Sequence, residues 1–277
     1  MKIHQIIFSP TGGTRRVSEI LCRPMEQREQ QPDLLGVCRG TTGEGVSQGM
    51  KSECVVTDLC VKAADIQLPT IHEEDLVVIA MPVFAGRVPA MAVERLQMVN
   101  SHGAKCVVVV VFGNRAYDDA LLELQDVASG MGFRVIAAVG AVAEHSIIRK
   151  YGNGRPDADD EETLRRFGAD IMRKAEGADC TMPEVPGKRP YKKGGKVPHP
   201  KGRSGCNRCG LCARECPADA IPLSDPKTVD AGKCISCMRC VSACPTGSRS
   251  IGVVMDFLAT QGLKRVCAAR KENELYL

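Results

Sequence analysis

The sequence is poor in aromatic residues and has no long apolar run. Only 4% of its 277 residues are aromatic, and none is tryptophan. The longest apolar run is CVVVVVF, at residues 106–112, whereas a membrane-spanning helix needs roughly 20 such residues. This run therefore predicts a buried strand, and we expect no membrane span. The apolar stretch near the N-terminus is too short for a secretory signal, so we expect a cytoplasmic location.

The chain also lacks a strong excess of either charge. Its formal net charge is +4, which is too mild to indicate nucleic acid by itself, and Tyr191 is the only aromatic residue within the most basic segment. We therefore expect no nucleic-acid partner. The chain is 44% hydrophobic, which at this length is enough for one sizeable domain and a smaller one.

Strand-like and helix-like segments alternate over the first 176 residues. Continuous apolar strands separated by helices indicate an α/β fold, in which a parallel sheet is covered on both faces. Five such strands suit the doubly wound order 2-1-3-4-5. The polar, glycine-rich residues 28–51 are interpreted as a long surface loop or mobile insert. The expected strands are 3–8, 53–59, 75–83, 104–112 and 133–142, and the expected helices are 14–25, 89–99, 118–131 and 159–176.

A turn of small and hydroxyl residues, SPTGGT, joins the first strand to the first helix. Backbone amides and the helix dipole concentrate partial positive charge at such a helix N-terminus. Ser9, Thr11 and Thr14 can each donate a hydroxyl hydrogen there, and Gly12 and Gly13 permit close approach of a ligand to the backbone. We therefore predict a site for a phosphate monoester. Ordinary helix capping is the alternative, and the sequence matches neither a Walker loop nor the dinucleotide fingerprint.

Two further loops follow the third and fourth strands, and the carboxyl ends of parallel strands bring such loops together. Their aromatic and small residues suit stacking against a flat redox-active ring and close approach of the backbone to its polar edge. The predicted cofactor-binding residues in these loops are Pro82, Val83, Phe84, Ala85, Gly86, Phe112, Gly113, Asn114 and Tyr117.

Eight of the fifteen cysteines form two matching blocks, CNRCGLCARECP and CISCMRCVSACP, which are 28 residues apart. Three cysteines at i, i+3 and i+6 can reach three irons of one cubane, and the fourth, which precedes a proline, ligates the other cluster in this pattern. Zinc is the alternative, but a zinc site does not need this doubled pattern, and the C-x-x-C-H motif of a c-type haem is absent. We predict two [4Fe–4S] clusters, with cluster I on Cys206, Cys209, Cys212 and Cys244, and cluster II on Cys234, Cys237, Cys240 and Cys216.

The SPTGGT turn resembles the phosphate loop of flavodoxins, which bind FMN, and the resemblance covers about residues 1–176. It implies a flavodoxin-like sheet with the second and third loops beside the isoalloxazine ring. Flavodoxins often hold this ring between Trp and Tyr. This chain has no Trp, so we nominate Phe84 and Tyr117 as the ring neighbours.

About residues 203–250 resemble bacterial two-cluster ferredoxins, and CPADAI after the first block fits them well. The whole chain resembles flavodoxin–ferredoxin fusion proteins, which are found mainly in anaerobes. The phrases GNRAYDDALLEL, AEHS and CGLCARECPADAI carry that likeness. We expect a flavodoxin-like FMN domain at 1–176, a basic Pro/Gly-rich linker at 177–203, a small α+β two-[4Fe–4S] ferredoxin domain at 204–250, and a C-terminal extension at 251–277 that packs on the body.

The resemblance implies electron transfer with unidentified redox partner proteins. Each cluster passes one electron, whereas FMN holds one or two, so the three groups together can couple one-electron and two-electron partners. A flavin-dependent reductase of a small substrate, fed by the clusters, is the alternative, and a module that reports redox state is a third. The sequence shows no catalytic set of recognisable spacing, and it leaves the oligomeric state open.

Three features have two interpretations each. Arg87 and Arg115 lie in loops expected around the ring, where a guanidinium would raise the potential of the reduced flavin; the alternative is exposure or pairing with a neighbouring aspartate. His145 lies either near the cofactor or in a purely structural position. The basic segment 186–203 either docks an acidic redox partner or simply joins the domains.

Overall fold

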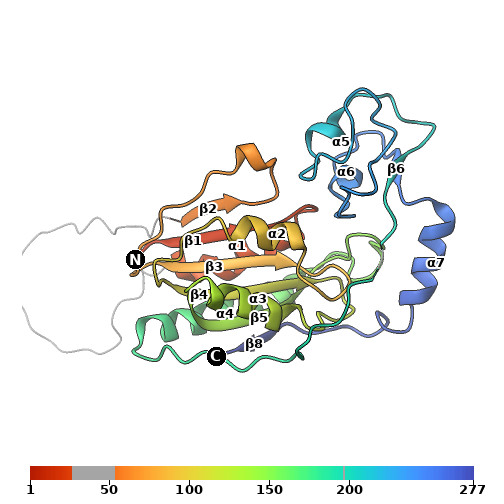
Figure 1. The fold of residues 1–277 in the computed structure, drawn as a ribbon. Helices are drawn as coiled ribbons and strands as arrows, with labels where there is room; N and C mark the ends of the chain where they lie inside the picture. Colours follow the sequence, from red (N-terminus) through yellow and green to blue (C-terminus); the bar gives the residue numbers. More distant parts are fainter. Residues whose placement is uncertain (27–53, 196) are drawn as a thin grey trace, which may run out of the picture.

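The computed structural model describes residues 1–26, 54–195 and 197–277. It consists of a sheet domain, which contains the large sheet and its helices, and a cysteine module, residues 201–250, near the carboxyl ends of the strands (Figure 1). The insert predicted at 28–51 lies outside the described residues. No helix in the described ranges has the length and apolar content needed to cross a bilayer.

A parallel sheet forms the centre of the sheet domain. Its strands pair in the order β2-β1-β3-β4-β5, all parallel, which is the doubly wound order predicted from the sequence. β3 is buried along its whole length because helices cover both of its faces. The strands are β1 (Ile3–Ile7), β2 (Cys54–Asp58), β3 (Leu76–Pro82), β4 (Lys105–Phe112) and β5 (Arg134–Val142), and a 3-10 turn, η2 (Ala63–Asp65), follows β2.

Two pairs of helices cover the faces of the sheet. Val17, Leu21 and Leu164 belong to the core on one face, and Leu96 and Leu121 belong to the core on the other. Burial of each such side chain contributes roughly 1.5–3 kcal/mol, which is why these short amphipathic helices are stable only against the sheet. The first face carries α1 (Gly13–Glu26) and α4 (Ala158–Glu176), and the second carries α2 (Ala90–Leu96) and α3 (Ala120–Gly130).

The C-terminal residues add a sixth strand to the sheet, where five were predicted. β8 (Glu274–Tyr276) pairs antiparallel with β5, and Tyr276 lies opposite Ala138. Three residues are too few to show the alternating pattern of a strand, so no local pattern predicts it. The preceding helix, α7 (Val253–Leu263), lies between the cysteine module and this strand in the chain (Figure 1).

The cysteine module has little regular secondary structure. Two short helices, α5 (Leu211–Arg214) and α6 (Arg239–Ser242), lie within the two cysteine blocks, and β6 (Lys201–Gly202) pairs antiparallel with β7 (Arg249–Ser250). The sequence repeat is also a repeat of backbone conformation. Left-handed φ angles recur 28 residues apart, at Arg208 and Ser236, at Gly210 and Met238, and at Asp219 and Gly247.

Candidate functional site

The predicted phosphate turn lies between β1 and α1, at the carboxyl edge of the sheet. Gly12 has a φ of 92°, in the left-handed region that glycine tolerates without strain. Ser9 accepts a hydrogen bond from the Arg15 amide at 2.9 Å, so its oxygen caps the helix as the alternative interpretation expected. In the parts of the chain that the structure describes, the hydroxyls of Thr11 and Thr14 have no hydrogen-bond partner. Both are therefore free to donate to an anion at this turn.

A hollow of about 390 Å³, partly open to solvent, lies beside this turn, and we call it the edge hollow. Its walls come from the phosphate turn, the ends of β3 and β4, the loop after β5 and the cysteine module. The predicted cofactor residues that line it are Thr11, Gly13, Thr14, Pro82, Val83, Phe84, Phe112 and Gly113.

Several lining residues were not among the predicted ones. Ala143, Glu144 and Ser146 line the edge hollow from the loop after β5. The segment AEHS directly follows the carboxyl end of that strand, so the topology rule that selected the other loops could have selected this one. Cys237 also lines the edge hollow, from the cysteine module. Local sequence carries no signal for that contact, because it joins distant parts of the chain.

A tight turn at residues 84–87 borders the edge hollow through Phe84. Phe84 and Arg87 exchange backbone hydrogen bonds of 2.9 and 3.1 Å, and Ala85 and Gly86 between them have φ angles of 51° and 84°. Ala85 and Gly86 are therefore the tip of a tight turn, and they do not line the hollow. Ser9 and Gly12, which shape the phosphate turn, are likewise absent from its lining.

Asn114 and Tyr117 have partners from the C-terminal extension instead of a place in the edge hollow. The Asn114 side-chain amide donates to the carbonyls of Cys267 and Ala269 at 3.0 and 3.1 Å. The Tyr117 hydroxyl contacts the carboxylate of Glu274, and burial raises its pKa. Their position in the loop after β4 predicted that both residues lie near the ring. In the structure, their polar groups instead form hydrogen bonds with residues of the C-terminal extension.

The two arginines expected around the ring are both in ion pairs. Arg87 makes a two-pronged contact with Glu123, with both N–O distances 2.7 Å, and Arg115 pairs with Asp118. The carboxylates offset the charge that was predicted to act on a flavin. Arg115 therefore pairs with a neighbouring aspartate as the alternative predicted, whereas the partner of Arg87 is a glutamate that the prediction did not name.

His145 lies next to Gly113, which lines the edge hollow. Its Nδ1 accepts hydrogen bonds from the amides of Ile147 and Ile148 at 3.2 and 3.1 Å, and burial lowers its pKa. A Cβ on Gly113 would lie 2.7 Å from this histidine, so the absence of a side chain at Gly113 makes the contact possible. The histidine is satisfied structurally and is also adjacent to a residue that lines the hollow.

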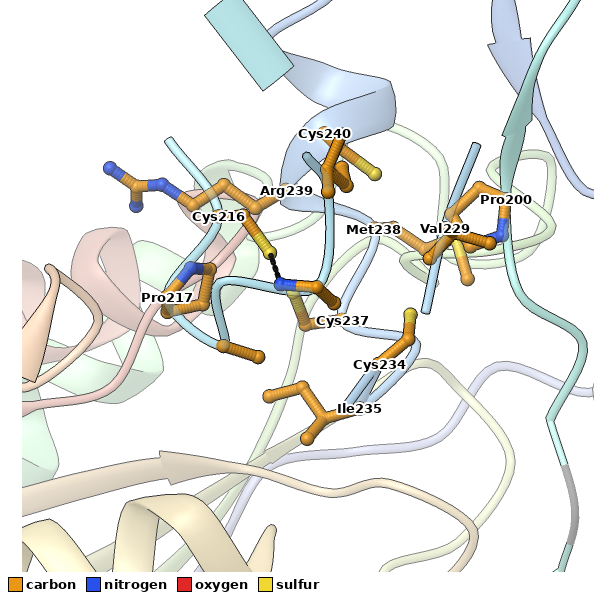
Figure 2. Close-up of a pocket in the computed structure, with 13 residues that line it drawn as sticks. Pro200, Cys216, Pro217, Val229, Cys234, Ile235, Cys237, Met238, Arg239 and Cys240 are labelled. Carbon is orange, nitrogen blue, oxygen red and sulfur yellow. Dashed lines mark hydrogen bonds between the residues drawn. The ribbon is translucent and has the colours of Figure 1, made fainter. Parts of the chain in front are cut away.

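Four cysteines line a second hollow, of about 330 Å³, which we call the cysteine hollow. They are the four residues that the cross-ligation rule assigns to cluster II, and Figure 2 shows their side chains around this space. Cys216 Sγ accepts a hydrogen bond from the Ala220 amide at 3.4 Å. Among the described residues, no three His, Cys, Asp or Glu side chains lie close enough to share a single metal ion. A [4Fe–4S] cubane takes four thiolates, and this is the number that Cys216, Cys234, Cys237 and Cys240 would supply at this hollow.

The thiols of the cysteine hollow are held in an apolar environment. Burial raises the pKa of Cys237, and it raises the pKa of Cys240 to about 11, although Arg249 opposes the second shift. Buried thiols of this kind are inert unless a metal replaces the proton. The hollow is therefore suited to resident iron rather than to thiol chemistry.

The set predicted for cluster I is more accessible. Cys209 is exposed, and Cys206 and Cys244 are half-buried. Burial raises the pKa of Cys244, but hydrogen bonds from Thr246 and the following amides outweigh burial, so the net pKa is lowered. Cys212 is buried next to the other set. Cys209 is therefore the most solvent-accessible cysteine of this set.

Buried and exposed polar contacts join the cysteine module to the sheet domain. Arg95 on α2, which is 7% exposed, donates to the carbonyls of Leu59, Val61 and Pro217 at 2.6 to 2.7 Å. Its three acceptors come from both parts of the molecule. Asp219 adds an exposed ion pair with a lysine that follows β2. These contacts hold the residues around Cys216 against the carboxyl edge of the sheet.

The basic segment is attached to the sheet domain by α3. The amides of Lys188 and Lys192 donate to the Asp119 carboxylate at 3.0 and 2.7 Å, and Arg189 pairs with Asp126. These contacts lower the pKa of both aspartates. Arg189 and Lys192 also place part of the segment's positive charge in ion pairs with the sheet domain.

Comparison with protein families identifies the cysteine module. Residues 205–248 match the model of the 4Fe-4S dicluster domain. A ferredoxin-like protein in the nif region of Sinorhizobium fredii is 41% identical over 49 residues, which cover 15% of this chain and 77% of that protein. The chain belongs to the 4Fe-4S dicluster ferredoxin family. Membership confirms the iron–sulfur domain that the two cysteine blocks predicted.

Solved flavodoxin structures resemble the remainder of this dicluster ferredoxin. One, from the domain Archaea, is 15% identical with a TM-score of 0.42, covering 64% of this chain and 100% of that one. Another, from Streptococcus pneumoniae TIGR4, is 17% identical with a TM-score of 0.38, covering 62% and 99%. The flavodoxin-like assignment itself is based on the observed strand order. The chain therefore combines an iron–sulfur domain with a sheet of flavodoxin-like strand order.

Proposed function

We propose that this protein relays electrons between two [4Fe–4S] clusters and FMN, and so couples one-electron to two-electron redox partners. One observation carries the proposal. Cys237, a predicted ligand of cluster II, lines both the cysteine hollow and the edge hollow. A single residue therefore forms the common wall between a site suited to a cubane and a site suited to a flavin.

The edge hollow fits FMN by the chemistry of its two ends. Thr11 and Thr14 would donate their hydroxyl hydrogens to the phosphate, which the N-terminus of α1 also attracts. Phe84, Phe112 and the bare backbone of Gly113 would line the ring. When bound, FMN supplies a group that accepts one or two electrons.

The cysteine hollow and the exposed set would act as the inner and outer clusters. Arg95 fixes Pro217, the residue after Cys216, so the inner cluster stays beside the edge hollow. Cys209 is exposed at the outer cluster, where a redox partner protein would approach. Because the cysteine module already occupies one wall of the edge hollow, the arrangement supports an electron carrier over the alternative of a small-substrate reductase.

The domain limits 1–176, 177–203, 204–250 and 251–277 belong to this proposal. The C-terminal extension, 251–277, does not form a separate unit in space, because its strand β8 pairs with β5 in the sheet of the first domain. A cytoplasmic location and an anaerobic host stay predictions from the sequence.

Stepwise reduction of the anaerobically reconstituted protein tests the proposal. We expect iron and sulfide for two clusters and one FMN per chain, with flavin absorbance bleaching after the clusters accept electrons. Iron-free protein loaded with FMN is the control, because it reports direct reduction of the flavin by the chemical reductant. Iron uptake without FMN retention, or flavin reduction at the control rate, would refute the relay.

A further inference from the structure

Arg249 is a buried cation inside the cysteine module. It is 2% exposed, and its guanidinium donates to the carbonyls of Pro200 and Thr228 at 2.9 and 3.5 Å, and to that of Pro226. Within the described parts of the chain, no carboxylate forms an ion pair with it. A charge buried without an opposite charge costs several kcal/mol as an order of magnitude, so the site calls for another source of negative charge.

The guanidinium lies between the two predicted ligand sets. Its Nη1 is 3.6 Å from Sγ of Cys212, which belongs to cluster I. Its positive charge also acts on the thiol of Cys240, which is assigned to cluster II, because Arg249 opposes the rise that burial causes in the pKa of that thiol. These two cysteines pack in one small core. Nε of Arg249 is buried and has no acceptor among residues 1–26, 54–195 and 197–277, so one N–H of this cation is unused there.

The internal repeat shows that the fold does not require arginine at this position. The residue 28 positions earlier is Ile221, which is also buried. Both residues follow a Cys-Pro pair at the same distance, in CPADAI and CPTGSR. An apolar side chain is sufficient in the first repeat. The second repeat therefore carries a buried charge that packing alone does not explain.

We propose that Arg249 tunes both clusters by stabilising their reduced, more negative states, which raises both midpoint potentials. Cluster potentials depend on local charge, on hydrogen bonds to sulfur and on burial. Arginine stays protonated at every working pH, and a buried charge is screened little by salt. The anionic clusters would in turn supply the opposite charge that Arg249 lacks. This inference is based on the proposed cluster assignment and does not depend on FMN.

Charge-changing variants of the iron-loaded protein test the inference. Arg249→Gln removes the charge and keeps donor groups, Arg249→Lys keeps the charge, and Arg203→Gln removes an exposed arginine next to β6 as the control. Cluster midpoints would be measured by redox titration followed by electron paramagnetic resonance, with iron counted per chain. We expect Arg249→Gln to disfavour reduction at least tenfold, a shift of about 59 mV for one electron. Arg249→Lys and Arg203→Gln should stay close to the wild type.

Three outcomes would overturn the inference. The first is an unchanged midpoint in fully iron-loaded Arg249→Gln, and the second is an equal shift in Arg249→Lys. The third is loss of iron from both Arg249 variants while Arg203→Gln keeps it, since Arg249 would then be purely architectural. Failure of the proposed relay is distinguishable from all three, because protein that binds iron but not FMN still permits every measurement.

Discussion

The two cysteine blocks have the same spacing but different surroundings. Cys237 and Cys240 are each 8% exposed and line a hollow that borders the sheet domain, whereas Cys209 is exposed on the outer side. The ligand pattern is symmetric, and the asymmetry comes from docking, because Arg95 on the sheet domain binds Pro217. The repeat thus encodes two similar sites, and tertiary contacts make one of them inner and the other outer.

The repeats also differ at single positions outside the ligands. At the left-handed position before the short helix, the first repeat has Gly210 and the second has Met238. A non-glycine residue in this conformation costs roughly 1 kcal/mol. Met238 is 3% exposed and lines the cysteine hollow, so burial of its side chain offsets that cost.

Removing one ligand from each set is the strongest way to break the comparison. We expect Cys237→Ala and Cys209→Ala each to lose about half of the iron, because each cubane needs four thiolates. Cys237→Ala should also abolish reduction of flavin through the clusters, whereas Cys209→Ala should keep it with a small chemical reductant. Iron analysis and anaerobic absorbance measure both effects. Equal loss of flavin reduction in the two variants would contradict the inner and outer assignment.

The phosphate end of the edge hollow gives the next largest effect. Thr14→Val removes a buried hydroxyl without changing shape, and a hydrogen bond to a charged group contributes about 1.5–3 kcal/mol. We expect FMN affinity to fall roughly tenfold to hundredfold. Thr57→Val on β2 is the matched control, since both threonines are 4% exposed. Fluorescence titration measures the affinity, and similar weakening in the control would place the phosphate elsewhere.

Loss of Arg95 should weaken the docking of the cysteine module on the sheet domain, so that its inner and outer ends become more similar in exposure. Arg95→Met would leave buried carbonyls of Leu59 and Pro217 without donors, at a cost of about 1–3 kcal/mol. Urea unfolding should show this loss, and flavin reduction should slow as the module separates from the sheet. The exposed Arg134→Met should stay within about 0.5 kcal/mol of the wild type. Unchanged unfolding in Arg95→Met would remove the docking explanation.

The sequence predicted the sheet well because its signal is local. Uninterrupted runs such as residues 106–112 become inner strands, and the glycine-rich turn ends β1 as expected. β8 has only three residues, and its pairing with β5 depends on contacts far apart in the chain, so no pattern could indicate it. The order and type of the main helices and strands were therefore predictable from the sequence, whereas the sixth strand, β8, at the edge of the sheet was not.

The candidate site divides in the same way. Thr14 and Phe84 were found because their loops follow strand ends, a rule that depends on topology alone. Tyr117 was placed at the ring by the same rule, but Glu274 and Tyr276 bind its hydroxyl. Cys237 joins the edge hollow through domain docking, which spacing does not encode. Contacts between distant parts of the chain thus explain why Tyr117 was predicted wrongly to line the hollow and why Cys237 was not predicted to line it.

The smallest expected effect concerns Arg87 and Arg115, which form ion pairs, in contrast to Arg249, which forms none among the described residues. Arg115→Gln and Arg87→Gln should leave the flavin midpoint unchanged, because Asp118 and Glu123 already neutralise these guanidinium groups. Arg249 has no such partner among the described residues, so its charge acts outward where theirs does not. Flavin titration of the FMN-loaded variants measures this. A lowered flavin midpoint potential in either variant would contradict this prediction. It would show that an arginine in an ion pair still affects the potential of a nearby flavin.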